Sequence, residues 1–188
     1  MHAIARLSAE EFGTCVKELA DLLVDAVDDG ASVGFVTPFG HEAAEAWWRA
    51  QAPAVAAGDL LVWVCRADGA LTGSATGSAI GVVGLVRAGK PNARHRGEIV
   101  KLMVRRDARG RGLSRALLAT AEQAALETGV DLLLLDTETG STAEHVYLTG
   151  GWTRYGIVPG YAGSPDGTPR DCSFFYKRLT TREVTGSA

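Results

Sequence analysis

Residues 109–118, with the sequence RGRGLSRALL, place glycines and arginines at the point where a helical pattern begins. The first N–H groups of a helix have no partner within the helix, so they are free to bind an anion. Arg109, Arg111 and Arg115 crowd the positive end of that helix dipole, where cations are normally disfavoured. A bound polyanion would make this arrangement favourable, whereas a solvated basic turn is the alternative for the segment taken alone.

Two carboxylates stand at the ends of apolar runs on either side of this segment. Glu98 begins the run that precedes the loop, and Asp136 ends the apolar run 132–135 that follows the helix. A carboxylate at the edge of an apolar environment is a candidate for proton transfer. Each also has a structural alternative: Glu98 could pair across strands with Arg94 or Arg96, and Asp136 could cap backbone N–H groups.

Helical segments are marked by caps and by apolar residues at helical spacing. Ser8 and Glu11 form a capping box ahead of a predicted helix over residues 9–28. Ser141 and Glu144 form a second capping box, which opens a short helix. Two further helices are predicted over 41–57 and 111–128.

Six runs rich in β-forming residues predict strands, near 60–65, 80–86, 98–104, 132–135, 152–157 and 171–178. The first three form an antiparallel meander. The strand–helix–strand unit that ends at 132–135 predicts one parallel pairing. Small polar residues at 72–79 predict a hairpin tip, and 159–169 is expected to be a loop between the last two strands. These elements predict a mixed α/β fold.

Composition bounds the class of protein. The 188 residues fit one domain, and 46% hydrophobic with 22% charged residues is typical of a packed core. The net charge of −3 offers no general attraction to nucleic acid or to anionic lipid. No apolar run is long enough for a membrane span or a signal segment, so we expect a cytoplasmic protein.

Cysteines and histidines show no spacing typical of a metal site. Cys15, Cys65 and Cys172 are an odd number without a C-x-x-C pair, so we interpret them as buried thiols in a reduced compartment. The four histidines are scattered along the sequence, and no metal is expected.

The arginine-glycine loop and the segments around it resemble the GNAT family of N-acetyltransferases. The family pattern Q/R-x-x-G-x-G/A appears as Arg109, Gly112 and Ser114, with Ser114 where Gly or Ala is usual. The resemblance implies that the loop binds the pyrophosphate of acetyl-CoA. The residues it assigns to the cofactor are Arg109, Gly110, Arg111, Gly112, Leu113, Ser114 and Arg115.

A later family pattern, N-x-x-A-x-x-x-Y-x-x-x-G-F, appears as Gly140, Ala143, Tyr147, Gly151 and Trp152. Gly140 lacks the usual Asn side chain. Four segments also resemble the tabtoxin-resistance acetyltransferase group: GASVGF (30–35), KLMV (101–104), LDTETGS (135–141) and PGYAGSPDG (159–167). This second resemblance implies a small toxin-like or amino-acid-like amine as substrate.

The resemblance implies a mostly antiparallel, twisted sheet of six to seven strands, with a parallel pair at the cofactor cleft and about four helices. We expect one domain over residues 1–179 and a frayed tail over 180–188. The implied function is direct acetyl transfer from acetyl-CoA to a primary amine of a small molecule. A protein or peptide N-acetyltransferase and a non-catalytic acyl-CoA-binding module are the alternatives. A homodimer is left open.

Residue roles follow from the same resemblance. Glu98, with Asp136 as partner or alternative, is expected to take the proton of the amine, and Tyr147 to protonate the departing sulfur. A strand bulge near Met103 or Val104 is expected to offer a backbone N–H to the oxyanion. Candidates for attracting the cationic substrate are Asp28, Asp29, Tyr161 and Asp166.

Overall fold

Helix α1 (Ala9–Asp28) has the boundaries that its caps and spacing predict. The Ser8 side chain accepts a hydrogen bond from the Glu11 N–H at 3.2 Å, and the Glu11 carboxylate accepts one from the Ser8 N–H at 2.8 Å. This capping box satisfies two backbone donors near the helix start. Phe12 and Leu19 on its inner face are fully buried, which anchors the helix to the sheet.

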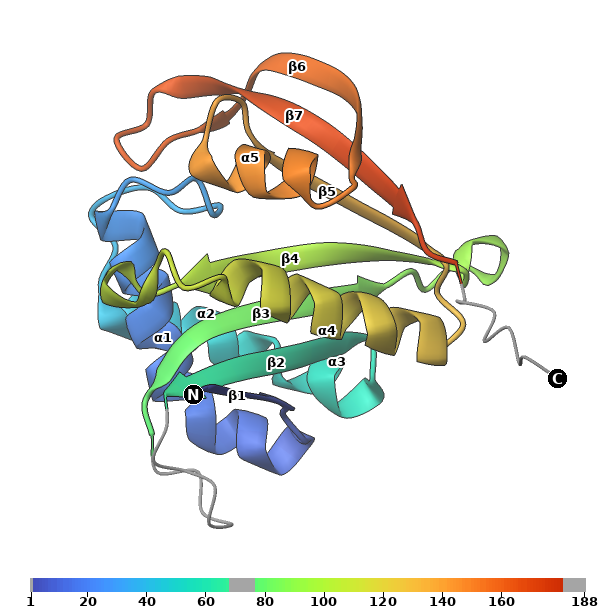
Figure 1. Ribbon diagram of the computed structural model, residues 1–188. Helices are drawn as coiled ribbons and strands as arrows, with labels where there is room; N and C mark the ends of the chain where they lie inside the picture. The colour runs from blue at the N-terminus through green and yellow to red at the C-terminus, as the bar shows by residue number, and fades with distance from the viewer. Residues whose placement is uncertain (1, 68–76, 181–188) are drawn as a thin grey trace, which may run out of the picture.

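The computed structural model describes residues 2–67 and 77–180 of the chain (Figure 1). The other helices are α2 (His41–Ala50), α3 (Ala52–Ala57), α4 (Leu113–Glu127) and α5 (Thr142–Thr149). The strands are β1 (His2–Arg6), β2 (Leu60–Ala67), β3 (Ala79–Arg87), β4 (Arg96–Val104), β5 (Leu132–Glu138), β6 (Thr153–Gly163) and β7 (Pro169–Arg178). The expected hairpin tip at 72–79 lies outside the described residues up to 76, and so does the expected tail from 181 onward.

The seven described strands form one mixed sheet in the order β1-β2-β3-β4-β5-β7-β6. All neighbouring strands are antiparallel except β4 and β5, which are parallel. This confirms the predicted mixed α/β fold. In the described part of the chain, no helix is both long and apolar enough to cross a membrane.

Helices cover the two faces of the sheet unequally (Figure 1). On one face, α1 and α2 enclose a core with side chains of β2, β3 and β4, such as Val62 and Val82. On the other face, α4 and α5 pack over a second core that reaches β5 and β7, with Leu133 and Phe175 at its centre. The layer that α1 and α2 form on the first face therefore ends near β4.

The parallel pairing of β4 and β5 is short. Only three pairs are in register, ending at Glu98 beside Leu134, although β4 continues to Val104 and β5 to Glu138. Beyond these pairs β4 stays with β3 and β5 follows β7, and the two strands diverge in Figure 1. The sheet is thus split at the carboxyl ends of its parallel pair, the place where α/β sheets commonly bind ligands.

A bulge interrupts β4 just inside this split. Val82 pairs with Met103 and Gly84 with Val100, so two residues of β4, Lys101 and Leu102, face one residue of β3. Lys101 has a φ of 51°, which is uncommon for a residue with a side chain. The predicted bulge exists, but it lies before Met103 and Val104, the residues at which we expected it. A bulge frees backbone groups from the ladder.

The sequence-based assignment of elements was wrong in three places, each for a local reason. The expected 41–57 helix is divided at Gln51, because Pro53 has no N–H to continue the α-helical ladder. Strand β1 was missed because its five residues are mostly exposed and lack a clear alternation of apolar and polar side chains. The expected 159–169 loop is reduced to the turn between β6 and β7, since edge strand β6 accommodates Pro159.

A matched pair of leucines tests this account of the core. Leu23 in α1 is fully buried, whereas Leu148 in α5 is 48% exposed. We expect Leu23→Ala to lower the free energy of unfolding by about 2–5 kcal/mol, because it leaves a cavity. Leu148→Ala should cost less than about 1 kcal/mol. Urea denaturation measures both, and equal losses would contradict the assigned packing.

Candidate active site

The loop between β4 and α4 presents unpaired backbone donors. Gly110 and Gly112 have φ values of 77° and 74°, a conformation that favours glycine. The first intrahelical bond of α4 runs from the Ala116 N–H to the Gly112 oxygen at 3.1 Å. Within the described residues, the N–H groups of Leu113, Ser114 and Arg115 have no hydrogen-bond acceptor. Among the described residues, and leaving out the immediate chain neighbours, no heavy atom lies within 4 Å of a Cβ placed on either glycine, so there is open space beside both glycines.

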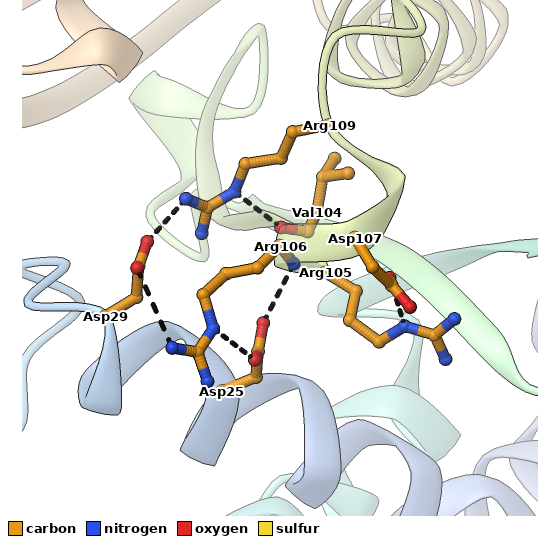
Figure 2. A network of polar contacts seen from close by, with 7 residues as sticks. All are labelled: Asp25, Asp29, Val104, Arg105, Arg106, Asp107 and Arg109. Atoms are coloured by element: carbon orange, nitrogen blue, oxygen red, sulfur yellow. Dashed lines mark hydrogen bonds and ion pairs between the residues drawn. The ribbon is translucent and has the colours of Figure 1, made fainter.

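An ion network fastens this loop to the C-terminal end of α1 (Figure 2). The Asp25 carboxylate accepts hydrogen bonds from the Arg106 N–H at 3.0 Å and from its Nε at 2.8 Å. Arg109 donates its Nε to the Val104 oxygen at 3.1 Å and forms an ion pair with Asp29. Asp29 also lies 3.9 Å from the Arg106 guanidinium. These contacts tie the loop to α1 on one side and to the end of β4 on the other.

The three arginines of the sequence motif differ in their partners. Asp29 balances the charge of Arg109. Arg111 donates to the Asp107 oxygen and Arg115 to the Thr149 hydroxyl, and in the described part of the chain neither has a carboxylate within 4 Å. Two positive charges near the α4 N-terminus thus remain for an anion.

Asp28 and Asp29, which we expected to attract the cationic substrate, lie at the end of α1 on the side of the arginine loop. Asp29 forms an ion pair with Arg109, and the negative charge of Asp28 contributes to the raised pKa of Arg106. The sequence offered no signal for this pairing, since the α1 acids and the loop arginines are about eighty residues apart.

Glu98 and Asp136 come together where the two parallel strands separate. Leu134 lies beside Glu98 in register, and Asp136 follows two positions later, so both carboxylates lie on one face of the sheet. Burial raises the pKa of Glu98, and the negative charge of Asp136 raises it further, while Arg96 and Lys101 act in the opposite direction. Burial also raises the pKa of Asp136, which Lys101 opposes. Both side chains still reach solvent.

The structure argues against the purely structural alternative for Glu98. Among the described residues, its carboxylate has no ion pair within 4 Å, neither with Arg94 nor with Arg96. An accessible carboxylate with a raised pKa and no fixed partner is a typical proton acceptor.

Lys101, at the bulge, was not singled out by the sequence. Its Nζ donates to the Val33 oxygen at 2.7 Å and lies over the rings of Trp47, at 4.8 Å, and Phe35, at 5.3 Å. Burial lowers the pKa of Lys101, whereas Asp136 and Glu98 raise it. A lysine inside a strand pattern gives no sign of a left-handed backbone, so this contact could not be predicted.

Lys101 secures one end of the loop that joins α1 to α2, and the β6–β7 turn secures the other end. Thr37 donates its N–H and its hydroxyl to the Pro165 oxygen, at 2.7 and 2.9 Å. Ser32 donates to the Gly163 oxygen at 3.5 Å. The loop thus bridges the two parts of the sheet on the side of Glu98.

Tyr147 is the most enclosed of the three predicted catalytic residues. Only 6% of it is exposed, and its ring packs against Trp152 and Phe175 with centroid distances of 5.8 and 6.0 Å. Its hydroxyl forms no hydrogen bond with any described residue. Burial and the charge of Asp136 strongly raise the pKa of this hydroxyl, so it stays protonated.

Glu144 fixes the turn between β5 and α5. One carboxylate oxygen accepts hydrogen bonds from Ser173 at 2.6 Å and Arg154 at 3.0 Å, and the other accepts one from the Gly140 N–H at 2.7 Å. The predicted capping box is only half formed, because Ser141 caps Glu144 but Glu144 bonds to Gly140 instead. Gly140 stands where the family pattern has Asn. It has a φ of 81°, and its hydrogen bond to Glu144 holds it in place.

Tyr161 and Asp166 fall into different surroundings. Tyr161 stacks edge-on against Phe174 with centroids 4.9 Å apart, and Phe174 is the cross-strand partner of Asp136. Asp166 accepts hydrogen bonds from Ser164 at 2.6 Å and from the Thr168 N–H at 2.9 Å, which lower its pKa to about 2. Asp166 closes the β6–β7 turn, so only Tyr161 lies on the face of the two carboxylates.

Comparison with known proteins agrees with this architecture. N-Acetyltransferases with similar structures include a ribosomal-protein-alanine N-acetyltransferase from Brucella melitensis, at 21% identity and a TM-score of 0.73, covering 94% of this chain and 99% of the other. An N-acetyltransferase from Staphylococcus aureus Mu50 has 16% identity and a TM-score of 0.74, with 96% and 99% covered. The protein yncA from Salmonella typhimurium, solved with its cofactor acetyl-CoA, has 17% identity and a TM-score of 0.72, with 100% and 99% covered.

These identities show the fold alone. The family itself is shown by sequence, because the profile of the acetyltransferase (GNAT) family matches residues 24–149, which include the arginine-glycine loop, both carboxylates and Tyr147. The chain belongs to the GNAT family of acetyltransferases.

Proposed function

We propose that the protein transfers the acetyl group of acetyl-CoA directly to a primary amine of a small molecule. The observation that carries the proposal is the split between β4 and β5. It brings unpaired N–H groups of α4 and an accessible carboxylate with a raised pKa to the same opening in the sheet. An anion site and a proton acceptor are the two components that acetyl transfer from this coenzyme requires.

The α4 N-terminus fits the diphosphate of the coenzyme. The N–H groups of Leu113, Ser114 and Arg115 have no acceptor among the described residues, and the two glycines before them leave open space. Arg111 adds a positive charge, and among the described residues no carboxylate lies within 4 Å of it. When bound, the coenzyme supplies an acetyl group activated as a thioester.

Glu98 takes the proton from the incoming ammonium group, which must become neutral before it can attack. Its raised pKa makes it a better proton acceptor at neutral pH than an ordinary carboxylate. Asp136 raises that pKa and adds a second negative charge that attracts the amine. Backbone N–H groups freed at the Lys101–Leu102 bulge would stabilise negative charge on the acetyl oxygen.

Tyr147 donates its proton to the departing sulfur as the C–S bond breaks, and the second proton that the nitrogen loses on forming the amide restores the tyrosine. Its hydroxyl is protonated because of burial, and no described residue accepts a hydrogen bond from it, so it is free to donate to a ligand. The packing of the ring against Trp152 and Phe175 fixes the direction of the hydroxyl.

A small molecule is the acceptor that the surrounding loops favour. The loop between α1 and α2 is fastened to Lys101 at one end and to the β6–β7 turn at the other, and this bridge restricts the acceptor side. The sequence resemblance to the tabtoxin-resistance group supports the same substrate class.

Two substitutions test the assigned roles. We expect Glu98→Gln and Tyr147→Phe each to lower kcat/KM by about 10²–10⁴-fold, the usual contribution of general acid–base catalysis. Free-thiol release from acetyl-CoA is the assay, with amino acids, polyamines, amine antibiotics and peptides as acceptors. Coenzyme binding, measured by calorimetry, should be unchanged in both variants. Wild-type turnover in both would reject the roles, and coenzyme binding without thiol release for any acceptor would favour a non-catalytic binding module.

The pH dependence of the reaction should respond to the charges around Glu98. The carboxylate must be ionised to accept a proton, so kcat/KM rises with pH through its raised pKa. Asp136→Asn removes a negative charge that raises this pKa, and the rising limb should move to lower pH. Lys101→Met removes a positive charge that lowers it, and the limb should move to higher pH. Profiles with one and the same amine cancel the titration of the substrate, and shifts in the same direction would contradict the assignment.

Two physical effects with opposite signs determine how the ion network at the loop changes the affinity for the coenzyme. Removing acids near a diphosphate site should tighten coenzyme binding if only charge matters. If Asp25 and Asp29 position the loop, their removal should weaken binding. We expect the double variant Asp25→Asn/Asp29→Asn to bind coenzyme A about three- to tenfold more weakly, as for the loss of one or two partly exposed ion pairs. Calorimetry decides, with Asp21→Asn on the same helix as control, and tighter binding would refute the positioning role.

A further inference from the structure

The sheet face that carries Glu98 and Asp136 continues as an open groove over the last three strands. Leu132, Leu134, Tyr155, Tyr176 and Arg178 line a groove of about 410 Å³ there. Helices α1 and α2 cover this face only as far as β4, so no helix of the described residues covers β5, β7 and β6 on this side. The groove is therefore a consequence of the topology.

The groove begins directly beside the carboxylates. Glu98 and Leu134 are neighbours in the parallel register, and Leu134 is in turn the cross-strand partner of Tyr176. Residues in direct register present their side chains to the same face of a sheet. One row of side chains thus runs from a proton-accepting carboxylate through an aliphatic to an aromatic residue.

Three further aromatic rings extend this row from Tyr176 along the same face. Tyr161 contacts Phe174 with ring centroids 4.9 Å apart, Phe174 lies 6.2 Å from Tyr155, and Tyr155 lies 6.2 Å from Tyr176. Tyr155 is 58% and Tyr161 53% exposed. Contiguous exposed aromatic side chains next to a site commonly mark a binding surface.

Charge is distributed unequally along the groove. Its inner end holds the two carboxylates, whereas Arg96 and Arg178 flank Leu132 at its outer end, each as a direct neighbour in register. An ammonium group is favoured at the inner end and disfavoured at the outer end. The sequence of negative charge, apolar surface and positive charge excludes a linear polyamine and suits a molecule with a single ammonium group.

We propose that this groove is the subsite for the body of the acceptor, and that the acceptor is a monoamine with an apolar, aromatic-sized group a few bonds from its nitrogen. This inference rests on the proposed function and narrows its substrate class. The amine is placed between Glu98 and Asp136, and the apolar body lies on Leu134, Tyr155 and Tyr176.

Three acceptors that each carry a primary amine on a methylene group test the subsite: phenethylamine, ethanolamine and 1,4-diaminobutane. Burial of apolar carbon contributes roughly a three- to fourfold gain in binding per methylene, so a partly covered phenyl ring should raise kcat/KM at least about tenfold over ethanolamine. We expect 1,4-diaminobutane to be the poorest acceptor. Tyr155→Ser and Tyr176→Ser should each lower kcat/KM for phenethylamine far more than for ethanolamine, so that most of the advantage of phenethylamine is lost. Leu148→Ser is the control, because Leu148 is an apolar residue on α5 whose exposure lies between those of the two tyrosines.

The outcomes separate this proposal from the proposed function. Equal kcat/KM for all three amines, or equal losses for all three in the tyrosine variants, overturns the subsite while acetyl transfer stands. Calorimetric binding of phenethylamine to the coenzyme-loaded protein that Tyr155→Ser abolishes, without thiol release, supports the subsite while acetyl transfer fails. A dimer in gel filtration that Tyr155→Ser dissociates, with unchanged selectivity, would assign the groove to a second copy of the chain and overturn the proposal. Neither binding nor reaction of any amine overturns both.

Discussion

The short parallel pairing of β4 and β5 is the constraint on which the rest of the structure depends. Because β4 keeps its pairing with β3 and β5 follows β7, only three pairs form before the sheet splits. The split leaves Glu98 accessible at the last pair, and the loop that leads into α4 follows the end of β4 beyond it. Both the proposed anion site and the proposed acceptor site thus lie beyond one irregularity in the hydrogen-bonded ladder.

Charges are divided between these two sites by the same topology. The acids at the end of α1 are occupied by Arg106 and Arg109, which leaves Arg111 and Arg115 at the helix N-terminus. At the inner end of the acceptor face, two carboxylates with raised pKa values stand beside one partly buried lysine, while Arg96 and Arg178 lie at its outer end. The first site therefore favours an anion and the second a cation. This division matches the reaction of an anionic coenzyme with an ammonium group.

The features that depend on local sequence could be predicted, whereas the features that depend on long-range contacts could not. Helix α1 could be predicted from its capping box, and the glycine loop from its place before a helix, because both signals are local. The pairing of Asp29 with Arg109 could not be predicted, since α1 and the loop meet only in the folded chain. The same holds for Lys101, whose left-handed backbone and contact with Val33 follow from the bulge.

Binding of pantetheine and of 4′-phosphopantetheine tests the central claim most directly, because the two molecules differ only in the phosphate that the α4 N-terminus is assigned to hold. Calorimetry on the folded protein should show the phosphorylated molecule binding at least about tenfold more tightly, as for a few charge-assisted hydrogen bonds. Raised salt should reduce this difference, because exposed charges are screened. Equal affinities for the two molecules would contradict the assignment of the loop, and with it the proposed reaction.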